Sequence, residues 1–232
     1  MKGSGSNEPI DNPRMTQAFS ALPLSPDTLA NLDQLGYTEM TAIQAASLPL
    51  ALAGKDLIAQ ASTGSGKTAA FGLPVVEKLT ANFHAVQALV MCPTRELADQ
   101  VTTEIRRLAR ATANIKVVTL CGGVALRGQE QSLQHGAHVV VGTPGRILDH
   151  LTRGNLRLDS VKTLVLDEAD RMLDMGFYDD MKQLIAQCPA QRQTLMFSAT
   201  MPKKIRDLAQ AILKDPEEIS IAISKPAEGV LQ

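Results

Sequence analysis

The chain has 232 residues, of which 44% are apolar, and this suits one α/β domain or two small ones. Lys and Arg number 23 against 24 Asp and Glu, so the charge of −1 gives no sign of a protein that binds nucleic acid through bulk positive charge. The sequence has no run of about 18 apolar residues and no secretory signal, so we expect a cytoplasmic protein without a membrane segment.

Residues 1–14 are rich in Gly, Ser, Pro and Asn, a composition that predicts a flexible leader, partly of vector origin. Met15 is a plausible natural start. Leucines then recur at helical spacing, in a helix that Ser25-Pro26 opens and Gly36 closes. A second helix is expected over residues 41–52.

Short apolar runs alternate with helix-like stretches over the rest of the chain. The expected strands are residues 56–60, 88–92, 116–120, 138–141, 163–166, 194–197 and 218–222. The expected helices between them include residues 66–79, 95–110, 145–153 and 203–212. This alternation predicts an α/β fold with a parallel sheet and helices on both faces. In such folds, ligands bind beyond the carboxyl ends of the strands.

The cysteines give no sign of a cross-linked or metal-binding protein. Cys92, Cys121 and Cys188 lie far apart, and no CxxC pair occurs. Their odd number argues against a disulfide framework, and the missing pair argues against zinc. We expect all three to be small core residues.

A glycine-rich loop follows the first expected strand: residues 61–68 read Ala-Ser-Thr-Gly-Ser-Gly-Lys-Thr, with Ala61 where the common P-loop has its first glycine. Small residues let backbone N–H groups surround phosphate oxygens, and the helix that follows directs its positive end at the same anion. Lys67 supplies a charge for the β- and γ-phosphates, and the Thr68 hydroxyl is a ligand for Mg²⁺. The alternative is a turn that only caps a helix. The predicted ATP-binding residues of the loop are Ser62, Thr63, Gly64, Ser65, Gly66, Lys67 and Thr68.

The expected strand 163–166 ends in Asp167-Glu168-Ala169-Asp170, which fits the acidic half of a P-loop site. Asp167 would hold Mg²⁺ through water, because this ion keeps much of its hydration shell. Glu168 would orient the attacking water or accept its proton. Lys67, Asp167 and Glu168 are therefore the candidate catalytic residues. The alternative is an acidic first turn placed favourably on a helix dipole.

These two motifs belong to a larger set, and the chain resembles the DEAD-box ATP-dependent RNA helicases over nearly all of residues 19–222. Ser198-Ala199-Thr200 is similar to the family's Ser-Ala-Thr motif. The sequences ELADQV (96–101), LCGG (120–123) and SLQH (132–135) most resemble the bacterial DbpA subgroup. The resemblance implies the N-terminal RecA-like domain of such a helicase, a P-loop NTPase fold.

The segment from Gly36 to Gln44 is similar to the family's adenine-recognition motif, although Met40 and Ala42 replace its usual prolines. A Gln44 amide offers the acceptor and donors that match adenine N6 and N7, and Tyr37 can stack on the base. Without the resemblance, Gln44 would be one polar residue on a helix.

Three further motifs are similar to the family's RNA-facing motifs. One Pro-Thr pair (93–94) and one Thr-Pro pair (143–144) each follow an expected strand and open a helix, which by itself is ordinary helix capping. Helix starts at one sheet edge can also hold successive phosphates through backbone N–H groups, which fixes position without reading sequence. The predicted RNA-binding residues are Pro93, Thr94, Arg95, Gly122, Gly123, Thr143, Pro144, Gly145 and Arg146.

Ser198 and Thr200 can hydrogen-bond Asp170 across the sheet edge, and the resemblance implies that this contact couples the nucleotide site to RNA unwinding. The alternative is a helix cap before Pro202. We expect the domain to cover residues 15–223 and an interdomain linker to begin at 224–232. The family's second RecA-like domain carries a His-Arg-x-Gly-Arg motif, and no His-Arg dipeptide occurs here.

We therefore expect a monomeric fragment that binds ATP and Mg²⁺, hydrolyses ATP poorly and unwinds RNA only together with the second RecA-like domain. A parent like DbpA would also target large-subunit ribosomal RNA. One rival reading is an ATP-gated RNA clamp in which turnover does not matter. Others are a DNA-directed motor and a small-molecule P-loop kinase, although no insertion long enough for a kinase lid is visible.

Overall fold

The computed structural model describes residues 17–221, so the predicted leader 1–14 and linker 224–232 lie outside the described residues. Within that range, seven strands form one sheet in the order β3-β4-β2-β5-β6-β1-β7, and every neighbouring pair is parallel. The strands are β1 Leu57–Gln60, β2 Ala88–Met91, β3 Val117–Leu120, β4 Val139–Gly142, β5 Thr163–Leu166, β6 Gln193–Ser198 and β7 Glu217–Ser220.

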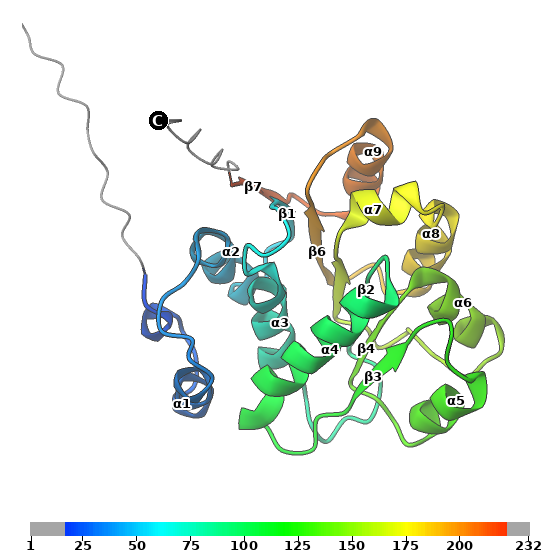
Figure 1. Cartoon of the computed structure of the whole chain (residues 1–232), viewed down its shortest axis with the longest axis horizontal. Helices are drawn as coiled ribbons and strands as arrows, with labels where there is room; N and C mark the ends of the chain where they lie inside the picture. Colours follow the sequence, from blue (N-terminus) through cyan, green and yellow to red (C-terminus); the bar gives the residue numbers. More distant parts are fainter. Residues whose placement is uncertain (1–16, 222–232) are drawn as a thin grey trace, which may run out of the picture.

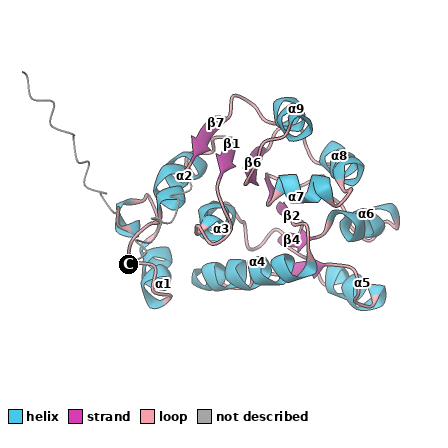
Figure 2. Ribbon diagram, turned by 45° about the horizontal axis from the view of Figure 1, so that its top comes forward, coloured by secondary structure: helices cyan, strands magenta, loops and turns pink. Residues whose placement is uncertain are grey.

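Helices cover both faces of this sheet, as the strand and helix alternation predicts (Figures 1 and 2). The α-helices are α1 Pro26–Gln34, α2 Ala42–Leu52, α3 Lys67–Glu77, α4 Arg95–Leu108, α5 Leu126–Gln134, α6 Pro144–Thr152, α7 Ala169–Asp174, α8 Tyr178–Gln187 and α9 Lys203–Ile212. Two 3₁₀ turns, Phe19–Ala21 and Ala109–Ala111, complete the described elements. The predicted α/β class is confirmed.

Alternate residues of each strand point into two separate cores, because successive side chains of a strand face opposite sides of the sheet. Ala88 and Val90 of β2 pack with α1 to α4, whereas Leu89 and Met91 pack with α6 to α9. Central strands such as β2 and β5 are buried on both faces, which explains why they read as continuous apolar runs rather than alternating ones.

Helix starts agree with the capping residues visible in the sequence. Ser25 caps α1 by accepting a hydrogen bond from the Thr28 N–H, with Pro26 in the first helical position. Thr41 and Gln44 form a reciprocal capping box at the start of α2. Strand bounds differ from the predicted ones by at most two residues, as is usual at element ends. None of the described helices has the length and apolarity needed to cross a membrane.

Candidate functional site

The polar motifs gather at one edge of the sheet, since parallel strands have their carboxyl ends on the same side. The loop 61–68 follows β1, Ser198-Ala199-Thr200 ends β6, and the acidic motif follows β5, so these three occupy adjacent positions in the sheet. The motifs predicted to face RNA follow the next three strands, β2, β4 and β3. The sheet order thus divides this edge into a nucleotide half and a nucleic-acid half.

The phosphate loop has a backbone that only glycine adopts without strain. Gly64 and Gly66 have φ angles of 80° and 88°, and Gly66 stands immediately before α3. A Cβ atom on Gly66 would lie 2.7 Å from Gln44 Nε2 and 2.9 Å from Thr41 Oγ1. The loop therefore packs directly against the start of α2.

Lys67, the first residue of α3, points into the acidic strand end. Its Nζ atom lies 2.9 Å from Asp167 Oδ1 and 3.3 Å from Glu168 Oε1. The Lys67 side chain is only 6% exposed and that of Asp167 is fully buried. The two halves of the predicted nucleotide site therefore lie in direct contact.

Asp167 is a buried carboxylate with incomplete pairing. Its Oδ1 atom is held by the ion pair alone, and Oδ2 has no hydrogen-bond partner among the described residues. Burial raises the pKa of Asp167 despite the neighbouring Lys67 ammonium. A buried carboxylate oxygen without a donor is costly, and a hard cation would satisfy it.

These residues fit Mg²⁺. Asp167 supplies a carboxylate oxygen, and Thr68 brings a hydroxyl from the first turn of α3. Within residues 17–221, no group of three or more His, Cys, Asp or Glu side chains is placed to hold a metal ion. A carboxylate and a hydroxyl oxygen suit Mg²⁺, which takes its other ligands from water and phosphate oxygens.

Glu168 adopts a strained backbone and is held from three sides. Its φ of 53° lies in the left-handed region, which is rare for a residue other than glycine. Its carboxylate accepts hydrogen bonds from Thr63 Oγ1 (3.2 Å), Lys67 Nζ (3.3 Å) and Arg171 Nη1 (3.3 Å). Strain of this kind persists only where the surroundings hold the residue in place. Arg171 was not predicted, although its place three residues after Glu168 on a helix was a usable signal.

Gln44 connects the segment predicted to recognise adenine with the phosphate loop. Its Oε1 accepts a hydrogen bond from the Thr41 N–H (2.9 Å), and its Nε2 donates to the Gly66 carbonyl (3.0 Å). Each end of the amide keeps one further hydrogen-bonding position. Tyr37 precedes Gln44 in this segment; its hydroxyl donates to Glu104 of α4 and its ring packs edge-on against Phe19. Burial and the Glu104 contact raise the pKa of Tyr37, so it stays un-ionised.

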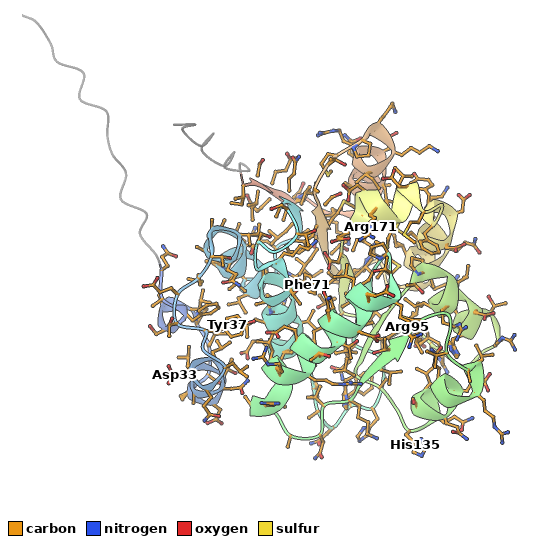
Figure 3. All side chains as sticks on the ribbon, viewed as in Figure 1. Asp33, Tyr37, Phe71, Arg95, His135 and Arg171 are labelled. Carbon is orange, nitrogen blue, oxygen red and sulfur yellow. The ribbon has the colours of Figure 1, made fainter. Side chains whose placement is uncertain are left out.

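The starts of α4 and α6 lie side by side, since the strands before them are neighbours. Thr94 does cap α4, by accepting from the Leu97 N–H, whereas Thr143 makes no side-chain cap. The arginines that follow differ: the Arg95 side chain is 51% exposed and that of Arg146 only 17%. Arg95 also lies next to Gly123, from whose would-be Cβ its Nη1 is 3.4 Å away. The positions of Arg95, Arg171 and Phe71 are labelled in Figure 3.

Asp170 is hydrogen-bonded across the sheet edge, as its motif predicts. Asp170 Oδ2 accepts from the Thr200 hydroxyl (2.8 Å) and the Thr200 N–H (3.0 Å), and its own N–H donates to Ser198 Oγ (3.1 Å). Burial alone would raise the pKa of Asp170, but the hydrogen bonds outweigh it and lower the pKa. No side chain caps α9, so the alternative reading of these residues as a helix cap does not apply.

Known proteins are similar to this chain in sequence and in fold. A family model described as DEAD/DEAH box helicase matches residues 41–208. The chain is 56% identical over 205 residues to the ATP-dependent RNA helicase DbpA of Escherichia coli K12, which covers 88% of this chain and 45% of that protein. It is 49% identical over 203 residues to the DEAD-box ATP-dependent RNA helicase CshA of Geobacillus kaustophilus, with 88% and 43% covered. The chain thus spans less than half the length of these curated relatives.

The fold comparison agrees. A DEAD box protein from the hyperthermophile Methanococcus jannaschii superposes with a TM-score of 0.83 and 43% identity, over 88% of this chain and 55% of that one. A hypothetical ATP-dependent RNA helicase from Sulfolobus tokodaii gives a TM-score of 0.78 at 37% identity. The sheet is therefore the RecA-like sheet of these helicases. The matched family model spans both halves of the site, and this chain belongs to the DEAD/DEAH box helicase family.

Proposed function

We propose that this chain is the first motor domain of an ATP-dependent RNA helicase and that it binds Mg-ATP and the RNA backbone at adjacent halves of one sheet edge. The observation that carries the proposal is the Lys67–Asp167 contact, in which a buried lysine and a partly unsatisfied carboxylate face each other across the phosphate loop. A bound triphosphate would pair with the Lys67 ammonium, and its cation would pair with the Asp167 carboxylate.

Each residue has a distinct part in this site. Lys67 and the loop amides hold the phosphates, and Thr68 and Asp167 hold Mg²⁺, which neutralises phosphate charge when bound. Glu168 orients the attacking water, with its carboxylate fixed by Thr63 and Arg171. Gln44 senses the base and the loop together, since it already bonds the Gly66 carbonyl.

The nucleic-acid half holds RNA through its backbone. Two neighbouring helix starts and the Gly122-Gly123 turn present N–H groups and Arg95 at the same edge, a set of local contacts that a domain of charge −1 can offer. Asp170 bonds Thr200 and Ser198 between the two halves, which supports its predicted role in coupling. Duplex unwinding in the cytoplasm, with ribosomal RNA as one substrate, is the activity of the longer protein in this proposal.

Calorimetric titration tests the proposal directly. ATP should bind the chain in the presence of Mg²⁺ more tightly than GTP does, and chelation of Mg²⁺ should weaken ATP binding. Single-stranded RNAs of different sequence should bind with similar affinities that fall with salt, because phosphate contacts dominate. Equal affinity for ATP and GTP would remove Gln44 from base recognition, and no ATP binding at all would contradict the proposal.

A further inference from the structure

A buried glutamine outside every motif considered above bridges two of the RNA-facing segments. Gln129 of α5 is 6% exposed, and its Nε2 donates to the Cys121 carbonyl at 2.8 Å. Its Oε1 accepts from Arg146 Nη1 at 3.0 Å. The same Arg146 nitrogen donates its other hydrogen to the Val124 carbonyl at 2.9 Å.

These bonds close a ring around the Gly122-Gly123 turn. Cys121 precedes the turn and Val124 follows it, so Gln129 and Arg146 hold the carbonyl on each side of the two glycines. Gly123 has a φ of 75°, and both glycines are exposed, so the turn itself does little to fix its own conformation. We name the four residues Cys121, Val124, Gln129 and Arg146 the turn clasp.

The orientation of the Gln129 amide follows from its partners. A backbone carbonyl only accepts and a guanidinium only donates, so Nε2 must face Cys121 and Oε1 must face Arg146. Oε1 then accepts a second bond from His150 Nε2 at 2.9 Å, which requires the Nε2–H tautomer. His150 is fully buried, and burial, helped by Arg146, lowers its pKa, in keeping with a neutral ring.

These bonds hold the Arg146 guanidinium in one orientation. Both hydrogens of Nη1 are used, and its Nε is 4.0 Å from Asp149 Oδ2. Among residues 17–221, Nη2 has no partner, so this side of the fork is available to a ligand. A guanidinium held in one rotamer loses less entropy on binding phosphate than a mobile one does.

We propose that Gln129 is a positioning residue for RNA binding: it fixes the Gly122-Gly123 turn and directs Arg146 toward an RNA phosphate without contacting RNA itself. The inference rests on the proposed function, because it takes this edge as the RNA site. It adds a residue of α5 to a site otherwise built from strand ends and helix starts. Replacing Gln129 should therefore lower RNA affinity only where Arg146 is present, without a general loss of stability.

The experiment measures the binding of a short fluorescent single-stranded RNA at low salt to the wild type, Gln129→Leu, Arg146→Ala and the double variant. Gln131→Leu is the matched control, since Gln131 is exposed on the same helix. Gln129→Leu should weaken binding at least about tenfold, the lower limit for loss of a hydrogen bond to a charged group. The double variant should bind no more weakly than Arg146→Ala, because the two act as one unit.

A second readout needs no RNA. The backbone ¹⁵N NMR order parameters at Gly123 and Val124 should fall in Gln129→Leu and stay unchanged in Gln131→Leu, at similar melting temperatures. Should Gln129→Leu fail to fold, Gln129→Glu replaces it: its carboxylate neutralises Arg146 and repels the Cys121 carbonyl, so RNA binding must again weaken.

The outcomes separate the two proposals. If wild type and Arg146→Ala bind RNA equally well, the proposed RNA face is wrong, whatever Gln129 does. If Arg146→Ala binds RNA weakly while Gln129→Leu binds RNA like the wild type and keeps the wild-type order parameters at the turn, only the positioning role is overturned. Additive losses in the double variant would also overturn it.

Discussion

Lys67 Nζ lies 2.9 Å from Asp167 Oδ1 although the strands that precede these residues, β1 and β5, are not neighbours in the sheet. Strand β6 separates them, so the phosphate loop must reach past the end of β6 to make this contact. Both charges are buried, and a buried pair with an unsatisfied oxygen stabilises a fold poorly. The presence of this unfavourable Lys67–Asp167 pair at the sheet edge is explained if the pair opens to receive a triphosphate and a cation.

Replacing Asp167 should show how the destabilisation caused by its buried, ionised carboxylate depends on pH. Burial raises the folded-state pKa of Asp167, so its stabilising contribution is present below about pH 4, the ordinary carboxyl value, and is lost as the pH rises through the folded value. Without nucleotide, the melting temperature of Asp167→Asn minus that of the wild type should increase between acid and neutral pH. A melting difference that stays constant or shrinks with rising pH would contradict this account.

Thr200→Val should have the opposite pH signature through Asp170. Hydrogen bonds lower the folded-state pKa of Asp170, so the stability they contribute is present above about pH 4 and is lost as the pH falls through the folded value. We expect Thr200→Val to raise the Asp170 pKa and to destabilise the chain by less than about 1 kcal/mol at neutral pH, because the pair is solvent-accessible. An NMR titration of the Asp170 carboxyl carbon measures the shift, and an unchanged pKa would refute it.

Gly66→Ala should destabilise the chain more than Gly64→Ala. Both positions have positive φ, which costs an alanine roughly 1–2 kcal/mol. Only at Gly66 would the added Cβ meet atoms at 2.7 and 2.9 Å, whereas nothing lies within 4 Å at Gly64. Chemical denaturation of both variants isolates the packing of the loop against Gln44 and Thr41. Equal losses would show that this packing is unimportant.

Glu168→Gln should separate binding from turnover. The amide keeps the size of the side chain but removes the base, so ATP affinity should stay within a few-fold of the wild type. In a protein that joins this chain to a second RecA-like domain, hydrolysis should fall at least about 100-fold, the lower range for a general base. Thr63→Val, which removes one bond to Glu168, is expected to slow hydrolysis less. Near-normal hydrolysis by Glu168→Gln would exclude a catalytic role for Glu168.

The sequence was informative where a local pattern has one physical meaning. A Gly-Ser-Gly-Lys-Thr loop after an apolar run predicts a strand, a turn and a helix, and β1 and α3 are there. The helix expected from residue 41 is also present, and it begins with a capping box of Thr41 and Gln44 that was not used to predict it. The alternation of such signals predicted the parallel sheet. Because ligands bind beyond the carboxyl ends of parallel strands, the sheet in turn predicted where the site lies.

What sequence reasoning missed depends on contacts between distant segments. Helix α8 carries Met181, Leu184 and Ile185 on one face, a helical spacing that was readable but not used. Gln129 gave no signal, since its partners Cys121 and Arg146 are brought to it by the order of β3 and β4. The bond from Gln44 to Gly66 likewise arises only when α2 packs on the loop.

Calorimetric titration of Lys67→Ala with Mg-ATP tests the central claim most directly, beside the wild type and the exposed-lysine control Lys182→Ala. The account predicts that the wild type and Lys182→Ala bind ATP alike, whereas Lys67→Ala, folded by circular dichroism, loses at least about 100-fold in affinity, as expected when a buried charge contact to phosphate is removed. Unchanged ATP affinity in Lys67→Ala would contradict the assignment of the phosphate loop and everything built on it.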